Sequence, residues 1–293
     1  MTMTDLPDSK AKTPKATLLY LFTRTPLHIG AGAGLGALDQ PIQRERPTGF
    51  PIIPGSSLKG VLRDAAERDP QIGEKGAAEI FGLPENAGLL AFGEARILAF
   101  PVRSARGSFA FITCPLALER FRREHGALSV QAPPTEPGEM TCLAGEAVSI
   151  PRAGQTGVVL EEYALTRSGL FPSDWEIALL ALLDDPVWKV GKGRFVLLSN
   201  GDFSHFVRTA CEVNQHVRLS DATGTAEKGG LFDLEAVPAE TLFFAPVISL
   251  PRSNGQIHQL TTMLQKTPVL QFGGDGTTGL GFCTVKLAEK EVQ

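Results

Sequence analysis

The pattern of apolar residues in the N-terminal part of the chain predicts a strand, a loop and a helix, in that order. Residues 18–22 form an unbroken apolar run that is typical of a buried strand. Apolar residues at the i, i+3, i+4 spacing then predict a helix over about residues 56–68, which ends before Pro70. Ser56 or Ser57 is the expected N-cap, because a serine hydroxyl can accept a hydrogen bond from the first free backbone N–H groups.

The rest of the chain alternates between strand and helix patterns. Strands are expected over residues 89–100, 107–114, 195–198, 241–247 and 282–287, and helices over residues 173–183, 202–213 and 256–266. The proline-rich residues 131–138 interrupt this pattern and mark an excursion from the core near residues 131–160. Strand, helix, strands, helix and strand, with insertions, is the order of a ferredoxin-like β-α-β-β-α-β core. We therefore expect an α+β fold in a single domain over residues 16–293, after a disordered segment at residues 1–15.

Two features of this sequence could bind an anion such as a phosphate group. The N-terminus of a helix carries free backbone N–H groups and the positive end of the helix dipole, and Lys59 and Arg63 lie one turn apart on the helix expected there. Near the C-terminus, a loop with Gly273 and Gly274 precedes the last strand, and glycines let backbone amides approach phosphates closely. Together the two features would form a track for a single strand of nucleic acid.

Two other motifs overlap the N-terminal loop and helix. Residues 32–37 match the dinucleotide-binding pattern G-x-G-x-x-A, but Pro41 indicates a loop where that site requires a helix. Residues 56–59 match the S-x-x-K motif of acyl-serine enzymes, although the S-D-N and K-T-G motifs that accompany it are missing. We therefore expect neither a nucleotide cofactor nor a serine nucleophile, and the remaining alternative is an ordinary loop before a capped helix.

Composition limits the class of protein. The 293 residues, 43% of them hydrophobic, suffice to bury a sizeable core. The four cysteines lie far apart with no C-x-x-C pair, which argues against a disulfide framework and against a zinc site. No apolar run reaches the roughly 18 residues of a membrane span, and the polar N-terminus lacks a signal-like segment. We expect a soluble, cytoplasmic protein with no membrane partner.

The net charge of −4 is distributed unevenly, and this changes what the charge implies. Residues 24–63 carry five basic and two acidic side chains, and residues 96–123 carry six basic side chains and one acidic side chain. All other residues together are therefore strongly acidic. Such segregation suits a protein with one basic groove for nucleic acid and an acidic exterior, although surface arginines are often merely solvated.

Two strings of the sequence, over residues 24–64 and 271–285, resemble the two signatures of the RAMP superfamily (repeat-associated mysterious proteins). The first contains PGSSLKG and the second contains QFGGDGTTGLG. Residues 103–114 and 160–163 are also similar, so the resemblance extends from about residue 17 to residue 286. Within the superfamily, the strings are most similar to the repeated backbone subunit of the Cmr, or type III-B, CRISPR effector complex. The backbone subunit of the type III-A complex shares the PGSSLKG helix.

The resemblance implies a modified RNA-recognition fold with a β-hairpin thumb that reaches the neighbouring subunit. It also implies that the aspartate that cleaves target RNA lies in the glycine-rich loop, which is Asp39 here, acting as a base or as the ligand of a divalent cation, Mg²⁺ or Mn²⁺. His28 is the nearest supporting acid or phosphate-positioning group, unless it is a strand residue that faces the core. Asp233 and Glu235 lie where family members tend to carry an acidic and an aromatic group, and their role is left open.

The resemblance thus implies an RNA-binding subunit of an RNA-guided, target-cleaving complex. Several copies would stack in a filament along a CRISPR guide RNA with other Cmr-type subunits, and each copy would cleave the single-stranded target RNA. One alternative is the same scaffold without nuclease activity, and another is a metal-free endonuclease that processes guide RNA. The expected RNA-binding residues are Ser56, Ser57, Lys59, Arg63, Arg44, Gly273 and Gly274.

Overall fold

The computed structural model describes residues 16–32, 34, 38–126, 130–152, 154–220 and 222–289, so the expected disorder at residues 1–15 lies outside the described residues. The larger strands are β1 (Ala16–Thr23), β6 (Ala95–Ser104), β7 (Ser108–Thr113), β8 (Thr141–Ala144), β10 (Gln155–Leu160), β11 (Tyr163–Gly169), β13 (Glu212–Leu219), β14 (Ala226–Ala236), β15 (Leu242–Ser249) and β17 (Phe282–Glu289). The short strands are β2 (Ile52–Ile53), β3 (Gly82–Leu83), β4 (Asn86–Ala87), β5 (Leu90–Phe92), β9 (Ile150–Arg152), β12 (Phe195–Leu197) and β16 (Val269–Gln271).

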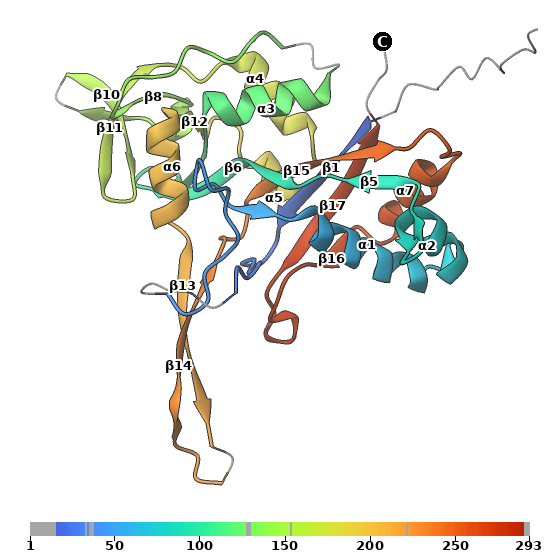
Figure 1. Cartoon of the computed structure of the whole chain (residues 1–293). Helices are drawn as coiled ribbons and strands as arrows, with labels where there is room; N and C mark the ends of the chain where they lie inside the picture. Colours follow the sequence, from blue (N-terminus) through green and yellow to red (C-terminus); the bar gives the residue numbers. More distant parts are fainter. Residues whose placement is uncertain are drawn as a thin grey trace, which may run out of the picture.

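The α-helices of the described residues pack around one large mixed sheet, and the expected α+β class is confirmed (Figure 1). The helices are α1 (Gly55–Arg68), α2 (Gly73–Phe81), α3 (Pro115–His125), α4 (Ser173–Ala181), α5 (Pro186–Lys189), α6 (Asn200–Thr209) and α7 (Gln256–Lys266). The short 3-10 helices η1 and η2 cover Glu146–Val148 and Gly276–Thr278. None of these helices is long and apolar enough to cross a membrane.

Four strands form the centre of the sheet in the order β17, β1, β15, β6, and each runs antiparallel to its neighbour. Alternate side chains of β1 enter two different hydrophobic clusters: Leu19 and Leu21 belong to the first, and Tyr20 and Phe22 belong to the second. Both faces of β1 are therefore covered. This is why the strand appears in the sequence as a continuous apolar run instead of an alternating one.

Different helices cover the two faces of this central part. Leu58 of α1 and Leu260 of α7 are fully buried in the first cluster, on one face. Leu118 of α3, Leu179 of α4 and Trp188 of α5 lie in the second cluster, on the other face. The Trp188 Nε1–H group donates to the Leu179 carbonyl at 2.9 Å, so this buried indole is satisfied without water.

Residues 105–241 form an inserted part between β6 and β15. The long strand β6 connects the two parts, because Ala99 pairs with Leu242 of β15 while Phe100 pairs with Ile112 of β7. Beyond β7 the sheet continues through β12, β8, β11, β10 and β9. The proline-rich residues 131–138 are irregular, as expected, but from Thr141 onward the chain pairs within this sheet.

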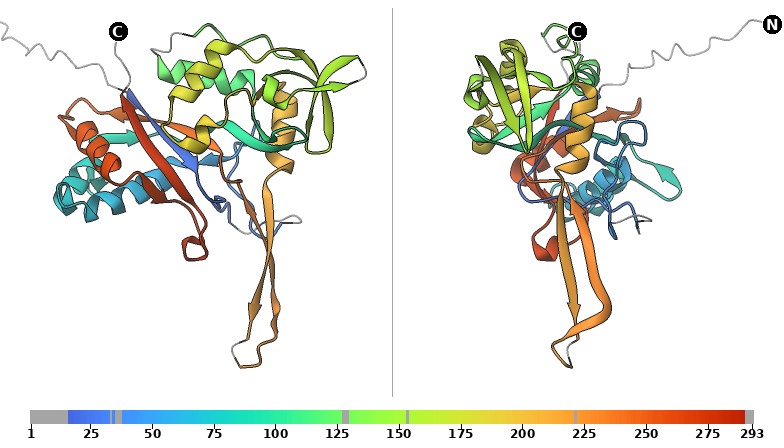
Figure 2. Two further views of the ribbon diagram at one scale, coloured as in Figure 1. Left: turned by 180° about the vertical axis from the view of Figure 1, so that it is seen from behind. Right: turned by 90° about the vertical axis from the view of Figure 1, so that its left-hand side faces the viewer.

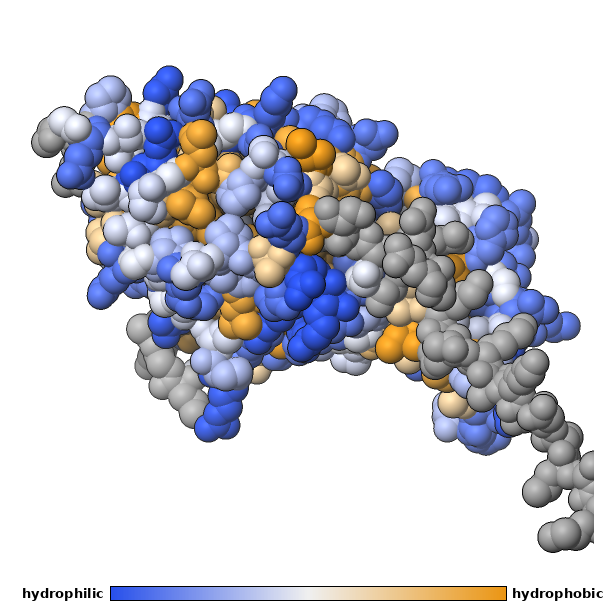
Figure 3. Space-filling model, turned by 90° about the horizontal axis from the view of Figure 1, so that it is seen from above, coloured by the Kyte–Doolittle hydropathy of each residue, from blue (hydrophilic) through white to orange (hydrophobic). Residues whose placement is uncertain are grey.

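A two-stranded hairpin, β13 with β14, projects from the body of the molecule (Figures 1 and 2). Its outer part has little to pack against, and the side chains of Val213, Val217, Leu219 and Leu231 are each about half exposed. On the opposite side, the residues that the structure describes form no comparable projection. Seen from above in Figure 3, its apolar side chains lie in separate spots among hydrophilic ones.

The start of α1 differs from the sequence-based prediction. The N-cap is Pro54, and no side chain caps the helix, so the prediction that Ser56 or Ser57 is the cap is wrong. The Pro54 carbonyl instead accepts the Ser57 amide at 2.9 Å. Gly55 is required at the first position, because a Cβ atom there would lie 2.4 Å from the Phe92 carbonyl oxygen. Residues 89–114 also differ, because they form three strands where two were expected.

Arg44 joins the segment before α1 to the inserted part. Its Nη1 group donates to the carbonyls of Gly49 and Val207 at 2.9 and 2.8 Å, and its Nη2 group contacts Glu235 Oε1 at 2.5 Å. Glu235 is 4% exposed, and its second oxygen accepts the Ile42 amide at 3.0 Å. The charge of this buried carboxylate is therefore balanced by a guanidinium and a backbone amide from a single segment.

Cys211 completes the surroundings of Arg44. Its Sγ atom accepts from Arg44 Nη2 at 3.3 Å and donates to the Val207 carbonyl at the same distance. Burial raises the pKa of this thiol to about 12, so it remains protonated at neutral pH. Arg44 therefore contacts the loop before α1, the end of α6 and the base of the hairpin at once.

Replacing Arg44 with methionine should lower the free energy of unfolding by about 3 kcal/mol, because it leaves the buried Glu235 carboxylate without its charged partner. Urea denaturation monitored by circular dichroism measures this change. The control is Arg68→Met, which breaks an exposed pair with Asp64 and should cost about 0.5 kcal/mol. Equal losses in the two variants would contradict the structural role of Arg44.

Candidate nucleic-acid interface

Asp39 lies at the base of the projecting hairpin. The chain beside it pairs with β14, since the Gln40 amide donates to the Asp233 carbonyl and the Glu235 amide donates to the Gln40 carbonyl, both at 3.0 Å. The Asp39 Oδ2 atom accepts the Asp233 amide at 2.9 Å. The side chain is exposed, and its Oδ1 atom has no hydrogen bond to the described part of the chain. One carboxylate oxygen is therefore oriented by the hairpin, and the other faces solvent.

His28 is buried, in agreement with the core-facing alternative that the sequence left open. It is 6% exposed, and its Nδ1 atom lies 2.7 Å from the Glu235 carbonyl oxygen. Its own carbonyl accepts the Gly274 amide at 3.0 Å. His28 therefore links the base of the hairpin to the C-terminal glycine loop, and little of its ring is accessible to a ligand.

The C-terminal glycine loop packs closely against the residues before Asp39. Gly273 has φ +76°, and a Cβ atom there would lie 2.1 Å from the His28 carbonyl oxygen, so only glycine fits. The Gly274 amide is used by His28, whereas the Gly273 amide has no acceptor in the described part of the chain. The glycine loop thus packs against His28, in the segment that leads into the Asp39 loop.

Gln271 holds the glycine loop in shape, and the sequence analysis did not single it out. Its Nε2 group lies 3.1 to 3.5 Å from four carbonyl oxygens, those of Phe272, Gly273, Gly274 and Leu280. One side-chain amide therefore gathers both ends of the loop. The only signal in the sequence is an isolated glutamine directly before the glycines, which no pattern distinguishes from a surface residue.

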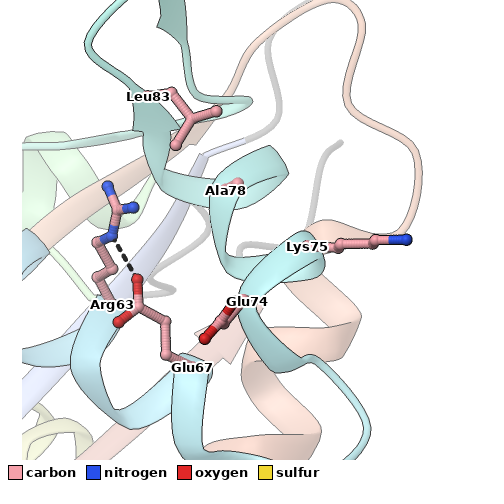
Figure 4. A pocket seen from close by; sticks show the side chains of 6 residues that line it. All are labelled: Arg63, Glu67, Glu74, Lys75, Ala78 and Leu83. Atoms are coloured by element: carbon pink, nitrogen blue, oxygen red, sulfur yellow. Dashed lines mark hydrogen bonds and ion pairs between the residues drawn. The ribbon is translucent and has the colours of Figure 1, made fainter.

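The residues predicted on α1 have different surroundings. Ser56 and Lys59 are exposed and Ser57 is half-buried, and the Lys59 ammonium group has no partner in the described residues. Arg63 is engaged: its Nε group donates to Glu67 at 2.7 Å and its Nη1 group donates to the Gly82 carbonyl at 2.9 Å. Figure 4 shows Arg63 lining a pocket between α1 and α2, so it faces the second helix.

Most of the arginines that suggested a basic groove are paired with carboxylates. Arg120 donates to both oxygens of Glu45 at 2.9 Å, and the remaining pairs are Arg96 with Glu45, Arg103 with Glu161, Arg122 with Glu119 and Arg123 with Glu124. Hydrogen bonding to Arg122 lowers the pKa of Glu119, and burial raises the pKa of Glu94 near Arg96 and Glu45. The local excess of positive charge over residues 96–123 is therefore smaller than the sequence indicates.

The described residues do not form a closed metal site. They contain no group of three His, Cys, Asp or Glu side chains that could hold an ion. Asp233 contacts Asp39 through its backbone amide, which donates to the Asp39 carboxylate. The Asp233 carboxylate itself accepts from the side-chain Nε2 group of Gln215 at 3.4 Å. Asp39 alone has too few donors for Mg²⁺ or Mn²⁺, which need about six oxygen ligands.

Comparisons with known proteins identify the family of this chain. The family model described as the RAMP superfamily matches residues 21–284. The CRISPR system Cmr endoribonuclease Cmr4 of Pyrococcus furiosus is 38% identical over 289 residues, which cover 94% of this chain and 96% of that protein. A crystal structure of oligomeric Cmr4 from Pyrococcus furiosus has a TM-score of 0.73 at 33% identity, over 95% of this chain and 99% of that chain.

A more distant structure shows the same fold. A chain in the cryo-EM structure of the type III-B Cmr-beta bound to cognate target RNA has a TM-score of 0.72 at 19% identity, and the match covers 93% of this chain and 96% of that chain. The resemblance inferred from the two sequence motifs is confirmed. This chain belongs to the RAMP superfamily and, within it, to the Cmr4 family.

Proposed function

We propose that this chain is the backbone subunit of a type III-B CRISPR effector complex, and that it binds guide RNA along its phosphate backbone and cleaves complementary target RNA at regular intervals. The observation that carries the proposal is the exposed Asp39 carboxylate, held at the hairpin base in a relative of an endoribonuclease. Copies of the chain would stack along the guide RNA in a filament, next to other Cmr-type subunits. The oligomeric Pyrococcus relative supports self-association.

The strand order supports a ferredoxin-like core. With α1 between β1 and β6 in the chain, and α7 between β15 and β17, the order β17, β1, β15, β6 is that of a β-α-β-β-α-β unit. We assign residues 16–293 to one RAMP domain in which residues 105–241 are an insertion. The sequence had suggested the excursion near residues 131–160 for the thumb implied by the family. The projecting hairpin β13–β14 would instead be the thumb, and it would contact the neighbouring subunit and distort the target strand (Figure 2).

The reaction would be a transfer of phosphorus between two oxygens of the RNA itself. Asp39 takes the proton of a 2′-hydroxyl group, the 2′-oxygen forms a bond to the adjacent phosphorus, and the bond from phosphorus to the 5′-oxygen breaks. The departing 5′-oxygen takes a proton from water, which leaves a 2′,3′-cyclic phosphate and a 5′-hydroxyl. The protein's main task is alignment, because the attacking and leaving oxygens must be in line. His28 would position the two loops instead of donating a proton.

RNA binding would divide between α1 and the glycine loop. The hydroxyl groups of Ser56 and Ser57, the Lys59 ammonium group and the Gly273 amide have no partner in the described residues and remain available for phosphate oxygens, whereas the Ser57 amide donates to the Pro54 carbonyl. Arg44, Arg63 and Gly274, although predicted from sequence to bind RNA, have their donor groups engaged within the chain. They would support the shape of the track.

Replacing Asp39 with alanine should lower the rate of target-RNA cleavage by about 100-fold or more, because a positioned general base contributes about that much. RNA affinity should not fall, since the proposed phosphate contacts come from α1 and the glycine loop and not from this carboxylate. Labelled target RNA and the assembled complex provide both measurements. Asp184→Ala removes a fully exposed aspartate from the α4–α5 connection and should change neither. Cleavage that persists in Asp39→Ala would favour another nuclease, and no cleavage by the unmodified chain would favour a purely structural subunit.

Lys59→Ala should weaken binding of single-stranded RNA and lower the slope of log affinity against log salt by about 0.7, the value for one phosphate contact. Arg63→Ala, one turn along the same helix, should change the slope little, since its guanidinium binds Glu67 and Gly82. Fluorescence anisotropy over a salt series measures both. A larger slope change for Arg63 than for Lys59 would contradict the proposed track.

Excess EDTA should stop target cleavage and leave RNA binding intact if a divalent cation, Mg²⁺ or Mn²⁺, takes part. Asp39 can supply only one carboxylate, so phosphate oxygens of the RNA would have to complete the ligand set. Adding back Mg²⁺ or Mn²⁺ should restore cleavage. Cleavage of precursor guide RNA by the isolated chain in EDTA would instead support the metal-free processing alternative.

A further inference from the structure

Three arginines from separate segments of the inserted part gather around one turn. Arg106, in the turn between β6 and β7, donates to the Ser149 carbonyl, and Arg167 of β11 donates to Ser149 Oγ at 3.1 Å. Arg194, just before β12, donates to the carbonyl of Gly107, the residue next to Arg106. The first two guanidinium groups thus contact the same serine, and the third contacts the adjoining turn.

These three arginines differ from the others in what they bind. Each donates to a neutral oxygen, and none has a carboxylate within 4.0 Å in the described part of the chain. In contrast, eight arginines are paired with Asp or Glu: Arg44, Arg63, Arg68, Arg96, Arg103, Arg120, Arg122 and Arg123. Because these three guanidinium groups have no carboxylate partner in the described residues, they leave a local excess of positive charge that attracts an anion such as phosphate.

The chemistry of the cluster favours nucleic acid over an acidic protein surface. A guanidinium has five donor hydrogens in a planar fork, and these arginines use few of them within the chain, which leaves donors for phosphate oxygens. The Arg194 Cζ atom lies 5.2 Å from the centroid of the half-buried Phe109 ring. A planar guanidinium above an aromatic ring offers a flat surface on which an unpaired base can stack.

The geometry points to a second RNA-binding site: we propose that Arg106, Arg167 and Arg194 bind the phosphodiester backbone of single-stranded RNA. The inference rests on the proposed function, that the chain binds RNA. The site lies beyond β6 in the sheet order, beside β7, β12 and β11, whereas β16, β17 and the glycine loop between them lie at the other end of the sheet order. An RNA strand bound at both the arginine cluster and the glycine loop would therefore contact the inserted part and the four-stranded centre.

The test compares two triple variants of the full chain that remove the same charge. R106Q/R167Q/R194Q removes the cluster, and the control R68Q/R122Q/R123Q removes three exposed arginines that are paired with carboxylates. Affinity for a 30-nucleotide oligouridylate is measured by anisotropy from 50 to 200 mM KCl. The cluster variant should bind at least tenfold more weakly at 100 mM, and its salt slope should fall by about 2, at ~0.7 per phosphate. The control should stay within twofold of the unmodified chain.

A third variant distinguishes an RNA contact from a merely structural role. R106K/R167K/R194K keeps the charge and should recover most of the salt slope, while urea midpoints show whether each variant is folded. Equal affinities and slopes for the cluster variant and the control would overturn the inference, as would a failure of the lysine variant to recover the slope while folded. Absence of binding by the unmodified chain would refute the proposed function itself, so the two failures are distinguishable.

Discussion

The position of Asp39 depends on one buried acidic residue, Glu235, which lies 196 positions later in the chain. Its backbone and carboxylate hold the N-terminal segment at several points at once, and the groups that they contact are the His28 ring, the Gln40 carbonyl, the Ile42 amide and the Arg44 guanidinium. A buried charge is stable only when it is balanced and hydrogen-bonded in this way. Because β14 continues outward from Glu235, the projecting hairpin and the Asp39 loop are held by the same residue.

The glycine loop is connected to the same centre through His28. The imidazole binds the hairpin base and the His28 carbonyl binds the glycine loop, so the three segments near Asp39 share a single residue. This arrangement accounts for the burial of a histidine that lies close to the Asp39 loop. It also accounts for Gly273, since any side chain there would collide with the His28 backbone.

Sequence reasoning succeeded where local signals decide the structure. The helix over residues 256–266 was predicted with its bounds, because its amphipathic spacing ends before Pro268. The PGSSLKG and glycine-rich motifs likewise led to the RAMP superfamily. Sequence reasoning failed where residues distant in the sequence determine the local structure. The N-cap of α1 is Pro54, and Gly55 after it lies close to Phe92. Arg63, predicted to bind RNA, donates to the Gly82 carbonyl. Hydrophobic periodicity in the sequence does not predict contacts of this kind.

The groups proposed to bind RNA and the carboxylate proposed to cleave it lie on different parts of the fold. The start of α1 and the glycine loop belong to the four-stranded centre, whereas Asp39 is tied to the hairpin base, which belongs to the inserted part. The distance from the Asp39 carboxylate to the proposed binding groups therefore depends on how the inserted part sits on the four-stranded centre. Alignment contributes much of the rate when the 2′-oxygen of RNA attacks the adjacent phosphorus. A single carboxylate can therefore suffice as the base if the two parts of the fold keep their relative position. That relation is maintained by β6, which pairs with both parts, and by Glu235 with Arg44.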